Sequence, residues 1–408
     1  MNRRTLARSR LAQTSLSIDN VRRPSRKFYF GPYNERCALP CDVVREIMLF
    51  SMQGEQGLLD DSKPPLLFCR VSLGWYEVAS TTQDLWTTIS VTEPYFTLQN
   101  LETVRTWLSR SGPTKLLHIT LSPSIINTNL GLIHSFQTLF LASSHRWSYL
   151  SLRIPVDLLP VMLNNPLVSL QALERLAIEL PSQPMLVLSP TATRLRSVFL
   201  TALPEHMAPH PLLLNLNWNN IRHVHLSTPS GTIEMVWRIL EFCPNLSGLS
   251  IHAANNMKCP HIPYDINRRL LNNLQRLTMR VNTRPGALEY FFDALFLPQL
   301  RELTLECIPN IGVQEETFLW PLRALLRLHA VALPPLTHFT LRGKVVQELD
   351  LIDLVSRIKS IRHLEVRDWN SSYVTASVRA LLARNANNRA QLSWQWEIER
   401  RNAGLSLS

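Results

Sequence analysis

Residues 300–305 read Leu-Arg-Glu-Leu-Thr-Leu, and this L-x-x-L-x-L spacing of apolar side chains recurs along most of the chain. The alternation in its second half places apolar side chains on one face of a short strand. With aliphatic or aromatic substitutions allowed, copies begin at Leu116, Trp147, Leu173, Leu195, Ile221, Leu246, Leu274, Leu300, Leu336 and Ile361. Most copies begin 22 to 28 residues after the previous one, with two longer intervals of 31 and 36. The chain is therefore predicted to consist of similar units that each begin with a strand.

Helical patterns separate many of these strands. Apolar residues recur at helical spacing in two stretches, one ending at Cys243-Pro244 and one between Pro285 and Pro298: Ile233, Val236, Ile239, Leu240 and Phe242, and then Leu288, Phe291, Phe292 and Leu295. One further L-x-x-L-x-L match, Val346/Leu349/Leu351, begins only 10 residues after its predecessor and is interpreted as a helix. A lone strand–helix unit cannot bury its apolar face, so the units are expected to stack.

The predicted fold is therefore an α/β solenoid with parallel strands on its concave face and helices on its convex face. The period is typical of leucine-rich repeats. The uneven spacing, and the scarcity of the asparagine usual in regular repeats, leave open another α/β solenoid or a compact α/β domain. Near the C-terminus, Leu392, Trp394, Trp396 and Ile398 alternate with polar residues, which suits either a final capping strand or an ordinary amphipathic segment.

The composition argues against several classes of protein. The 408 residues include only 12 glycines, and no glycine-rich phosphate-binding motif or nucleophile motif occurs. The six cysteines form no CxxC pair, so we expect no metal site. Acidic, histidine and serine residues are scattered without a catalytic pattern. We therefore expect neither an enzyme nor a cofactor.

The net charge of +11 is concentrated at one end of the chain. Residues 1–30 hold eight Lys or Arg and one acid, so the other residues carry only +4. Residues 1–35 are predicted to be a disordered basic leader, with nuclear localisation, a weak nucleic-acid contact or a transit peptide as alternatives. The near balance of charge elsewhere argues against a nucleic-acid partner. No apolar run approaches the roughly 20 residues of a membrane span, and no secretory signal is visible, so a cytoplasmic or nuclear location is expected.

Residues 36–90 interrupt the repeat and have a different character. Pro40 suits the start of a helix, and Val43, Val44, Ile47 and Met48 form an apolar stripe after it. After a polar spacer at residues 53–63, a second helix is predicted from Leu66, Leu67, Arg70, Val71, Trp75, Val78 and Ala79. A unit this small cannot bury so many large apolar groups, which indicates an exposed surface for a partner.

This segment resembles the F-box and F-box-like family. The family pattern runs roughly LPxEVLxEIF, then a leucine run, V-C/S-x-x-W and A-x-x-T-P-x-L-W. Matching residues are Leu39, Pro40, Ile47, Arg70, Val71, Trp75, Ala79, Thr82, Leu85 and Trp86. Asp42 stands where Glu is usual, Gln83 replaces the usual Pro, and Tyr76 replaces the usual Arg. The resemblance covers about 50 of 408 residues; without it, these helices would be read as a cap on the solenoid.

The resemblance implies a substrate receptor of a cullin–RING ubiquitin ligase, which binds a Skp-type adaptor through the F-box and a protein substrate through the repeats. Together with the charge and the repeat period, this divides the chain into a basic leader at 1–35, an F-box-like helical domain at 36–90 and a leucine-rich-repeat-like solenoid with a C-terminal cap at 91–408. The adaptor-facing candidates are Leu39, Pro40, Val43, Val44, Ile47, Leu66, Leu67, Val71 and Trp75. Leu85 and Trp86 would pack the F-box onto the repeats. The alternatives are a leucine-rich-repeat scaffold unconnected to ubiquitin, and an F-box protein working outside the ligase.

The substrate surface is expected on the concave side, where residues alternating with the core leucines project. The candidates are His223, His225, His252, Arg276 and Arg280, followed by Glu302, Glu306, His338, Arg342 and Arg367. An acidic or phosphorylated segment could lie across Arg276 and Arg280, because guanidinium groups pair with such groups. Exposed strand positions are, however, usually polar whatever their role.

Overall fold

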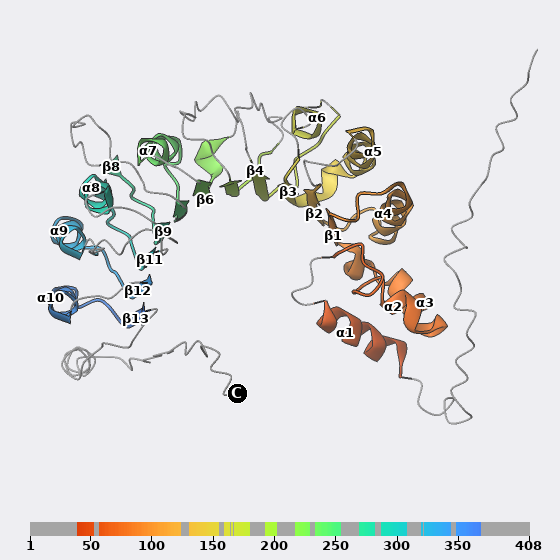
Figure 1. Ribbon diagram of the computed structural model, residues 1–408, viewed down its shortest axis with the longest axis horizontal. Coiled ribbons are helices and arrows are strands. Elements are labelled where there is room, and N and C mark those ends of the chain that lie inside the picture. Colours follow the sequence, from red (N-terminus) through yellow and green to blue (C-terminus); the bar gives the residue numbers. More distant parts are fainter. Residues whose placement is uncertain are drawn as a thin grey trace, which may run out of the picture.

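The computed structural model describes residues 39–52, 57–123, 130–154, 159–163, 165, 167–179, 192–201, 217–228, 233–253, 269–281, 287–307, 320, 322–343 and 348–368. The predicted basic leader and the predicted C-terminal strand lie outside these residues. Within them the protein is an α/β arch in which strands line the inner side and helices the outer side (Figure 1). A short helical unit stands at the N-terminal end of the arch.

The strands form one parallel sheet of 11 strands, ordered β1-β2-β3-β4-β5-β6-β7-β9-β11-β12-β13. Their bounds are β1 Thr88–Thr92, β2 Leu117–Ser122, β3 Trp147–Leu152, β4 Arg175–Glu179, β5 Ser197–Thr201, β6 His223–Thr228, β7 Gly248–Ala253, β9 Arg276–Val281, β11 Glu302–Cys307, β12 His338–Gly343 and β13 His363–Asp368. Two shorter strands, β8 Arg269–Leu270 and β10 Leu295–Phe296, pair with each other. Parallel neighbours need a crossover connection, and between many of the strands an outer helix supplies it.

The helices of the arch are α4 Leu98–Arg110, α5 Leu130–Leu141, α6 Leu159–Leu163, α7 Ile233–Phe242, α8 Ala287–Asp293, α9 Leu322–Ala332 and α10 Glu348–Arg357, with short 3-10 turns at η4 Ser144–Arg146 and η7 Trp218–Asn220. The expected helices at residues 233–242 and 287–293 are present. Leu349 and Leu351 lie in α10, so interpreting that extra L-x-x-L-x-L match as a helix was correct. Leu295, which we assigned to the second helical pattern, lies in β10 instead.

The apolar positions of the repeat build the core of the arch. Each inner strand turns alternate residues toward the helices, as Leu303 and Leu305 do on β11, and both are buried. A turn precedes many strands; the Leu246 amide, for example, donates to the Cys243 carbonyl at 3.2 Å. Asparagines in these turns join successive units: the side chain of Asn245 donates to the Asn219 carbonyl at 2.9 Å. These asparagines stand before the strands, so they differ from the asparagine that the repeat consensus places after them.

Two strand predictions needed correction. The sheet begins at β1 Thr88–Thr92, inside the segment that we assigned to the N-terminal unit up to residue 90. The copy of the repeat counted from Leu116 starts one residue later, because Leu117 is fully buried while Leu116 is 48% exposed.

The N-terminal helical unit consists of α1 Cys41–Ser51, α2 Phe68–Val71 and α3 Leu73–Thr81, followed by the 3-10 turn η3 Gln83–Trp86. The single helix predicted from Leu66 to Ala79 is therefore two helices. Ser72 separates them, because its backbone is extended and its hydroxyl accepts a hydrogen bond from the Trp75 amide at 3.2 Å. A serine in this role caps the start of α3 and ends α2.

The chain between α1 and α2 returns to the sheet. Leu58 forms a parallel bridge with Ser90 of β1, and the Ser90 amide donates to the Gly57 carbonyl at 2.8 Å. Gly57 has φ 64°, and a Cβ there would lie 2.2 Å from the Thr88 carbonyl oxygen. Only glycine fits this approach, so the segment is built to lie against the edge of β1.

Candidate functional site

Aromatic side chains fix the N-terminal helical unit to the arch. Trp86 is almost fully buried, and its indole N–H donates to the Ala79 carbonyl at 2.7 Å. Its ring meets the ring of Trp107 on α4 edge-on, with centroids 5.1 Å apart. The Arg110 guanidinium lies 4.6 Å from the centre of the Trp86 ring and also donates to the Tyr76 hydroxyl at 3.2 Å. The helical unit and the first repeat therefore share one core.

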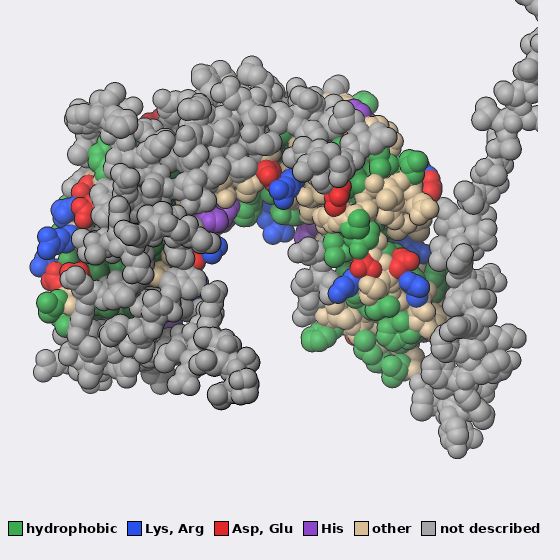
Figure 2. Space-filling model, in the orientation of Figure 1, with side chains coloured by type: hydrophobic (Ala, Val, Ile, Leu, Met, Phe, Trp, Pro, Cys, Tyr) green, Lys and Arg blue, Asp and Glu red, His purple; other side chains and the backbone are tan. Residues whose placement is uncertain are grey.

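The outer side of this unit carries exposed apolar residues, visible as apolar surface over the helices at that end of the arch (Figure 2). On α1 and just before it they form the α1 strip, defined as Leu39, Val43, Ile47 and Phe50. Three of these residues recur at spacings of four and three, so they share one helical face. Leu67, Val71 and Leu73 are also exposed, at the ends of α2 and the start of α3.

The predicted adaptor-facing residues divide between exposed and buried positions. Leu39, Pro40, Val43, Ile47, Leu67 and Val71 are exposed. Val44 does not belong with them: it is 6% exposed and lies in the core, on the face of α1 that also carries Met48. Leu66 and Trp75 are half-buried and pack against the core, where the Trp75 ring lies 6.0 Å from that of Phe68.

Three exposed residues with large apolar side chains were not predicted: Phe50, Leu73 and Tyr76. Phe50 is 73% exposed and Leu73 is 75% exposed. Phe50 follows Val43 and Ile47 at helical spacing, which was a usable signal in the sequence. Leu73 had no such signal, because its exposure results from the break between α2 and α3.

The concave face is made of three rows of side chains that run across the strands. The first row includes His223, Arg276 and Glu302, the middle row includes His225 and Thr304, and the last row includes His252, Arg280 and Glu306. The predicted concave residues therefore occupy one face of the sheet in the expected register. Histidine and basic side chains are visible inside the hollow of the arch (Figure 2). The side chain of Arg367 lies outside the described residues.

Burial lowers the pKa of His118, His223, His225 and His252 below the usual 6.5. Nearby cations lower it further: Arg276 and Arg222 act on His223, and Arg280 acts on His252. These imidazoles are therefore protonated less readily than a free histidine side chain. The central part of the concave face is polar and aromatic, with the His225 ring 5.6 Å from the Phe199 ring.

Arg280 is engaged within the protein. Its guanidinium lies 3.1 Å from a Glu306 carboxylate oxygen on the neighbouring strand. Arg342 pairs with Glu365 at 3.2 Å in the same way, and Arg153 pairs with Glu179 at 2.7 Å. In the residues that the structure describes, Arg276 has no carboxylate partner. Of the two arginines that we predicted would act together on an acidic ligand, Arg280 is therefore paired within the protein and Arg276 is not.

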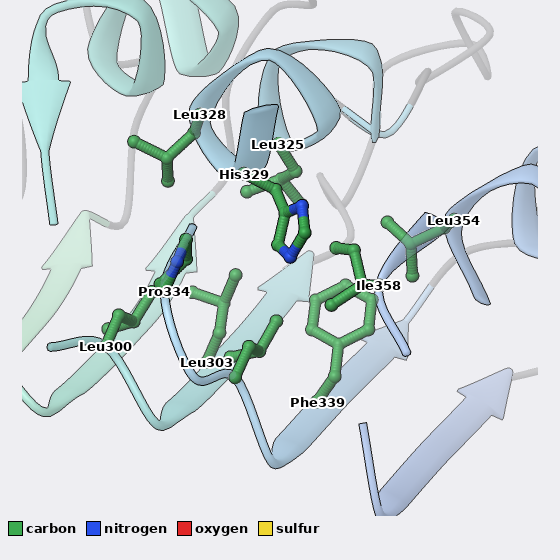
Figure 3. Close-up of a pocket in the computed structure, with 10 residues that line it drawn as sticks. Leu300, Leu303, Leu325, Leu328, His329, Pro334, Phe339, Leu354 and Ile358 are labelled. Atoms are coloured by element: carbon green, nitrogen blue, oxygen red, sulfur yellow. The ribbon is translucent and has the colours of Figure 1, made fainter. Parts of the chain in front are cut away.

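Two features of the described residues concern metal and small-ligand binding. No group of three or more His, Cys, Asp or Glu in those residues could hold a metal ion. One cavity lies between α9, α10 and the strands β11 and β12, lined by Leu303, Leu325, His329, Phe339 and Ile358 among others (Figure 3). Its volume of about 10 Å³ admits roughly one water molecule, so it is too small for an organic ligand. None of the described helices is both long and apolar enough to cross a membrane.

No family model matches this chain, and no curated protein matches it. Among solved structures, a Bacteroides fragilis protein is 12% identical over 60% of this chain and 74% of its own length, with a TM-score of 0.34. A TM-score this low does not relate the two folds.

Proposed function

We propose that this protein is a substrate receptor of a cullin–RING ubiquitin ligase, in which residues 39–86 form an F-box that binds a Skp-type adaptor. In this proposal the arch is a leucine-rich-repeat domain whose concave face holds a protein substrate. The protein performs no chemistry itself and raises the effective concentration of the substrate beside the transfer enzyme. Such a receptor would work in the cytoplasm or the nucleus.

The observation that carries the proposal is the α1 strip on a helical unit that is firmly joined to the arch. Leu39, Ile47 and Phe50 are 53%, 42% and 73% exposed, although each is large and apolar. Apolar surface concentrated on a small unit marks a protein-binding site, and a few such anchors supply most of the affinity of an interface. The resemblance to the F-box pattern over the same residues identifies the class of partner.

The joint between the two parts also supports a receptor. Trp86, Trp107 and Arg110 hold the helical unit against the first repeat through ring contacts at 5.1 Å and 4.6 Å. A receptor works by holding its substrate at a set position relative to the ligase, and a shared core maintains that position better than a flexible linker would.

The test is capture of a purified Skp-type adaptor by the full chain carrying the single substitution Ile47→Asp. A charge in an apolar interface is left desolvated, so we expect binding to fall at least about 100-fold. Val331→Asp on α9 is the matched control, because Val331 is 47% exposed against 42% for Ile47 and also lies on a helix. Trp75→Ala is a poorer choice, since this half-buried ring supports the core.

Capture of the adaptor by wild type and by Val331→Asp, together with loss in Ile47→Asp, would support the receptor. If wild type fails to bind any Skp-type adaptor tested, the helical unit is a cap and the arch is a scaffold without a link to ubiquitin. If the adaptor binds but the cullin is not recovered with it from cell extract, the protein acts outside the ligase.

A further inference from the structure

Another row of residues runs beside the concave face, at the edge of the sheet where the strands begin. The row begins at Ser148, and each later residue donates its amide N–H to the carbonyl of the residue before it in the row, at 2.8 to 2.9 Å. In order, the residues are Ser148, Glu174, Arg196, Arg222, Ser247, Gln275, Arg301, Thr337 and Arg362. The neighbouring positions, the first row of the concave face, include Arg175 and Arg276. We call these two adjoining rows the strand-start edge. All of its arginines are exposed.

The arginines at the two edges of the concave face differ in whether they form salt bridges. At the opposite edge, where the strands end, Arg153, Arg280 and Arg342 each form a salt bridge with a glutamate on the next strand. At the strand-start edge, among the described residues, none of Arg196, Arg222 and Arg276 forms a salt bridge. Because Arg196, Arg222 and Arg276 lie within four neighbouring strands and have no salt bridge among the described residues, we expect a more positive potential at this edge than at the strand-end edge.

The positive charge is densest around His223. Arg222 precedes it on the chain, Arg196 comes before Arg222 in the row, and both Arg222 and Arg276 lower the pKa of His223. Gly248 stands between His223 and Arg276 in the sheet register. A Cβ on Gly248 would lie 2.7 Å from Nδ1 of His223, so the absence of a side chain there lets the imidazole lie over β7, toward Arg276.

We propose that Arg196, Arg222 and Arg276 form a binding site for a short acidic peptide, a run of Asp or Glu residues in the protein that the arch holds. We name these three residues the basic patch. Guanidinium groups bind carboxylates through paired N–H donors, and these three are exposed and free to do so. The proposal rests on the proposed function only in taking the bound protein to be the substrate.

The limits of the basic patch indicate a peptide. Acidic residues flank it on both sides, with Glu174 before Arg196 in the row and Glu302 beside Arg276 on β11. Four neighbouring strands lie between these limits, and strand spacing makes the patch about 14 Å long. An extended peptide covers that length with about four or five residues. The bordering carboxylates would repel the phosphates of a longer nucleic-acid backbone.

The test is the fluorescence anisotropy of a labelled hexaglutamate peptide titrated with the full chain. We expect saturable binding that weakens at least about tenfold in the double variant Arg196→Gln/Arg222→Gln. The matched control is Arg153→Gln/Arg342→Gln, which removes the same net charge from the strand-end edge, where both arginines are already paired. That control is expected to change the affinity less than about threefold.

Equal loss in the two double variants would overturn the site, because net charge alone would then explain the binding. A labelled hexaglutamine peptide that binds as tightly as hexaglutamate would overturn it as well. Tighter binding of a single-stranded oligonucleotide, lost in Arg196→Gln/Arg222→Gln, would replace the peptide by nucleic acid. The assay contains no adaptor, so its result is independent of adaptor capture, which Arg196→Gln/Arg222→Gln should retain if the proposed function is correct.

Discussion

The N-terminal helical unit and the arch use their apolar residues in opposite ways. Within residues 39–76 the unit exposes eight large apolar side chains, and the described part of residues 88–368 exposes only seven, scattered over a much longer stretch: Leu98, Leu116, Leu167, Leu270, Val331, Leu333 and Leu349. A repeat inside the arch has neighbours on two sides and a helical layer over its sheet. Among the described residues, the helical unit has a neighbour on one side only. This difference in exposed apolar surface is the reason that the proposed adaptor site is placed on the helical unit and not on the arch.

The largest effect is expected where the two regions join. Trp86→Ala removes a buried indole, its hydrogen bond to Ala79 and its contacts with Trp107 and Arg110. Truncating a buried Trp costs about 3–5 kcal/mol, so the free energy of unfolding from urea titration should fall by that amount. A change below about 1 kcal/mol would mean that the two regions do not share a core.

The second-largest effect on stability is expected to distinguish the buried face of α1 from its exposed face. Met48 is fully buried and its neighbour Ile47 is 42% exposed. Met48→Ala is expected to lower the free energy of unfolding by about 2–5 kcal/mol, and Ile47→Ala by roughly 0.5 kcal/mol or less. Urea denaturation of the pair measures the contrast directly. Similar losses in both variants would show that Ile47 packs inside the protein, and the α1 strip would lose its role as a binding surface.

The smallest effect concerns the concave face of the arch. Burial, aided by His252, lowers the pKa of His225 below 6.5, so the unfolded chain takes up a proton more readily than the folded one. Stability is therefore complete above about pH 6.5 and is lost as the pH falls through the lower pKa of the folded state. Urea titrations at pH 7.5 and 5.5 should show a smaller acid-induced loss in His225→Gln than in wild type. Equal losses would remove His225 as a contributor.

The repeated strands could be predicted from sequence because their signal is dense and periodic. The alternation of Leu303 and Leu305 with polar residues predicts β11, and the same pattern recurs along the sheet. β1 was missed because Leu85 and Trp86 fitted a motif of their own, and the strand Thr88–Thr92 followed immediately after it. The break at Ser72 was missed because the apolar spacing continues across it and only the backbone reveals the cap.

The candidate sites were predictable only in part. The exposed and buried faces of α1 could not be separated at Val43 and Val44, since adjacent valines look alike until the helix has a neighbour. The concave histidines and arginines were placed on the correct face by alternation alone. Which arginines are paired depends on the side chain that each neighbouring strand brings into register, as Glu306 does for Arg280. These salt bridges could not be predicted without the structure. The same holds for the lack of salt bridges at Arg196 and Arg222 among the described residues.

The bridge between Leu58 and Ser90 has a consequence for how the protein behaves in solution. The first strand of a sheet presents unpaired amide and carbonyl groups that readily recruit another chain, and such open edges promote aggregation. The carbonyl of Gly57 accepts from one of these amides, that of Ser90, in a position that only glycine permits. An arch expressed from residue 88 onward would therefore leave this edge of β1 uncovered, and we expect it to self-associate more readily than the full chain.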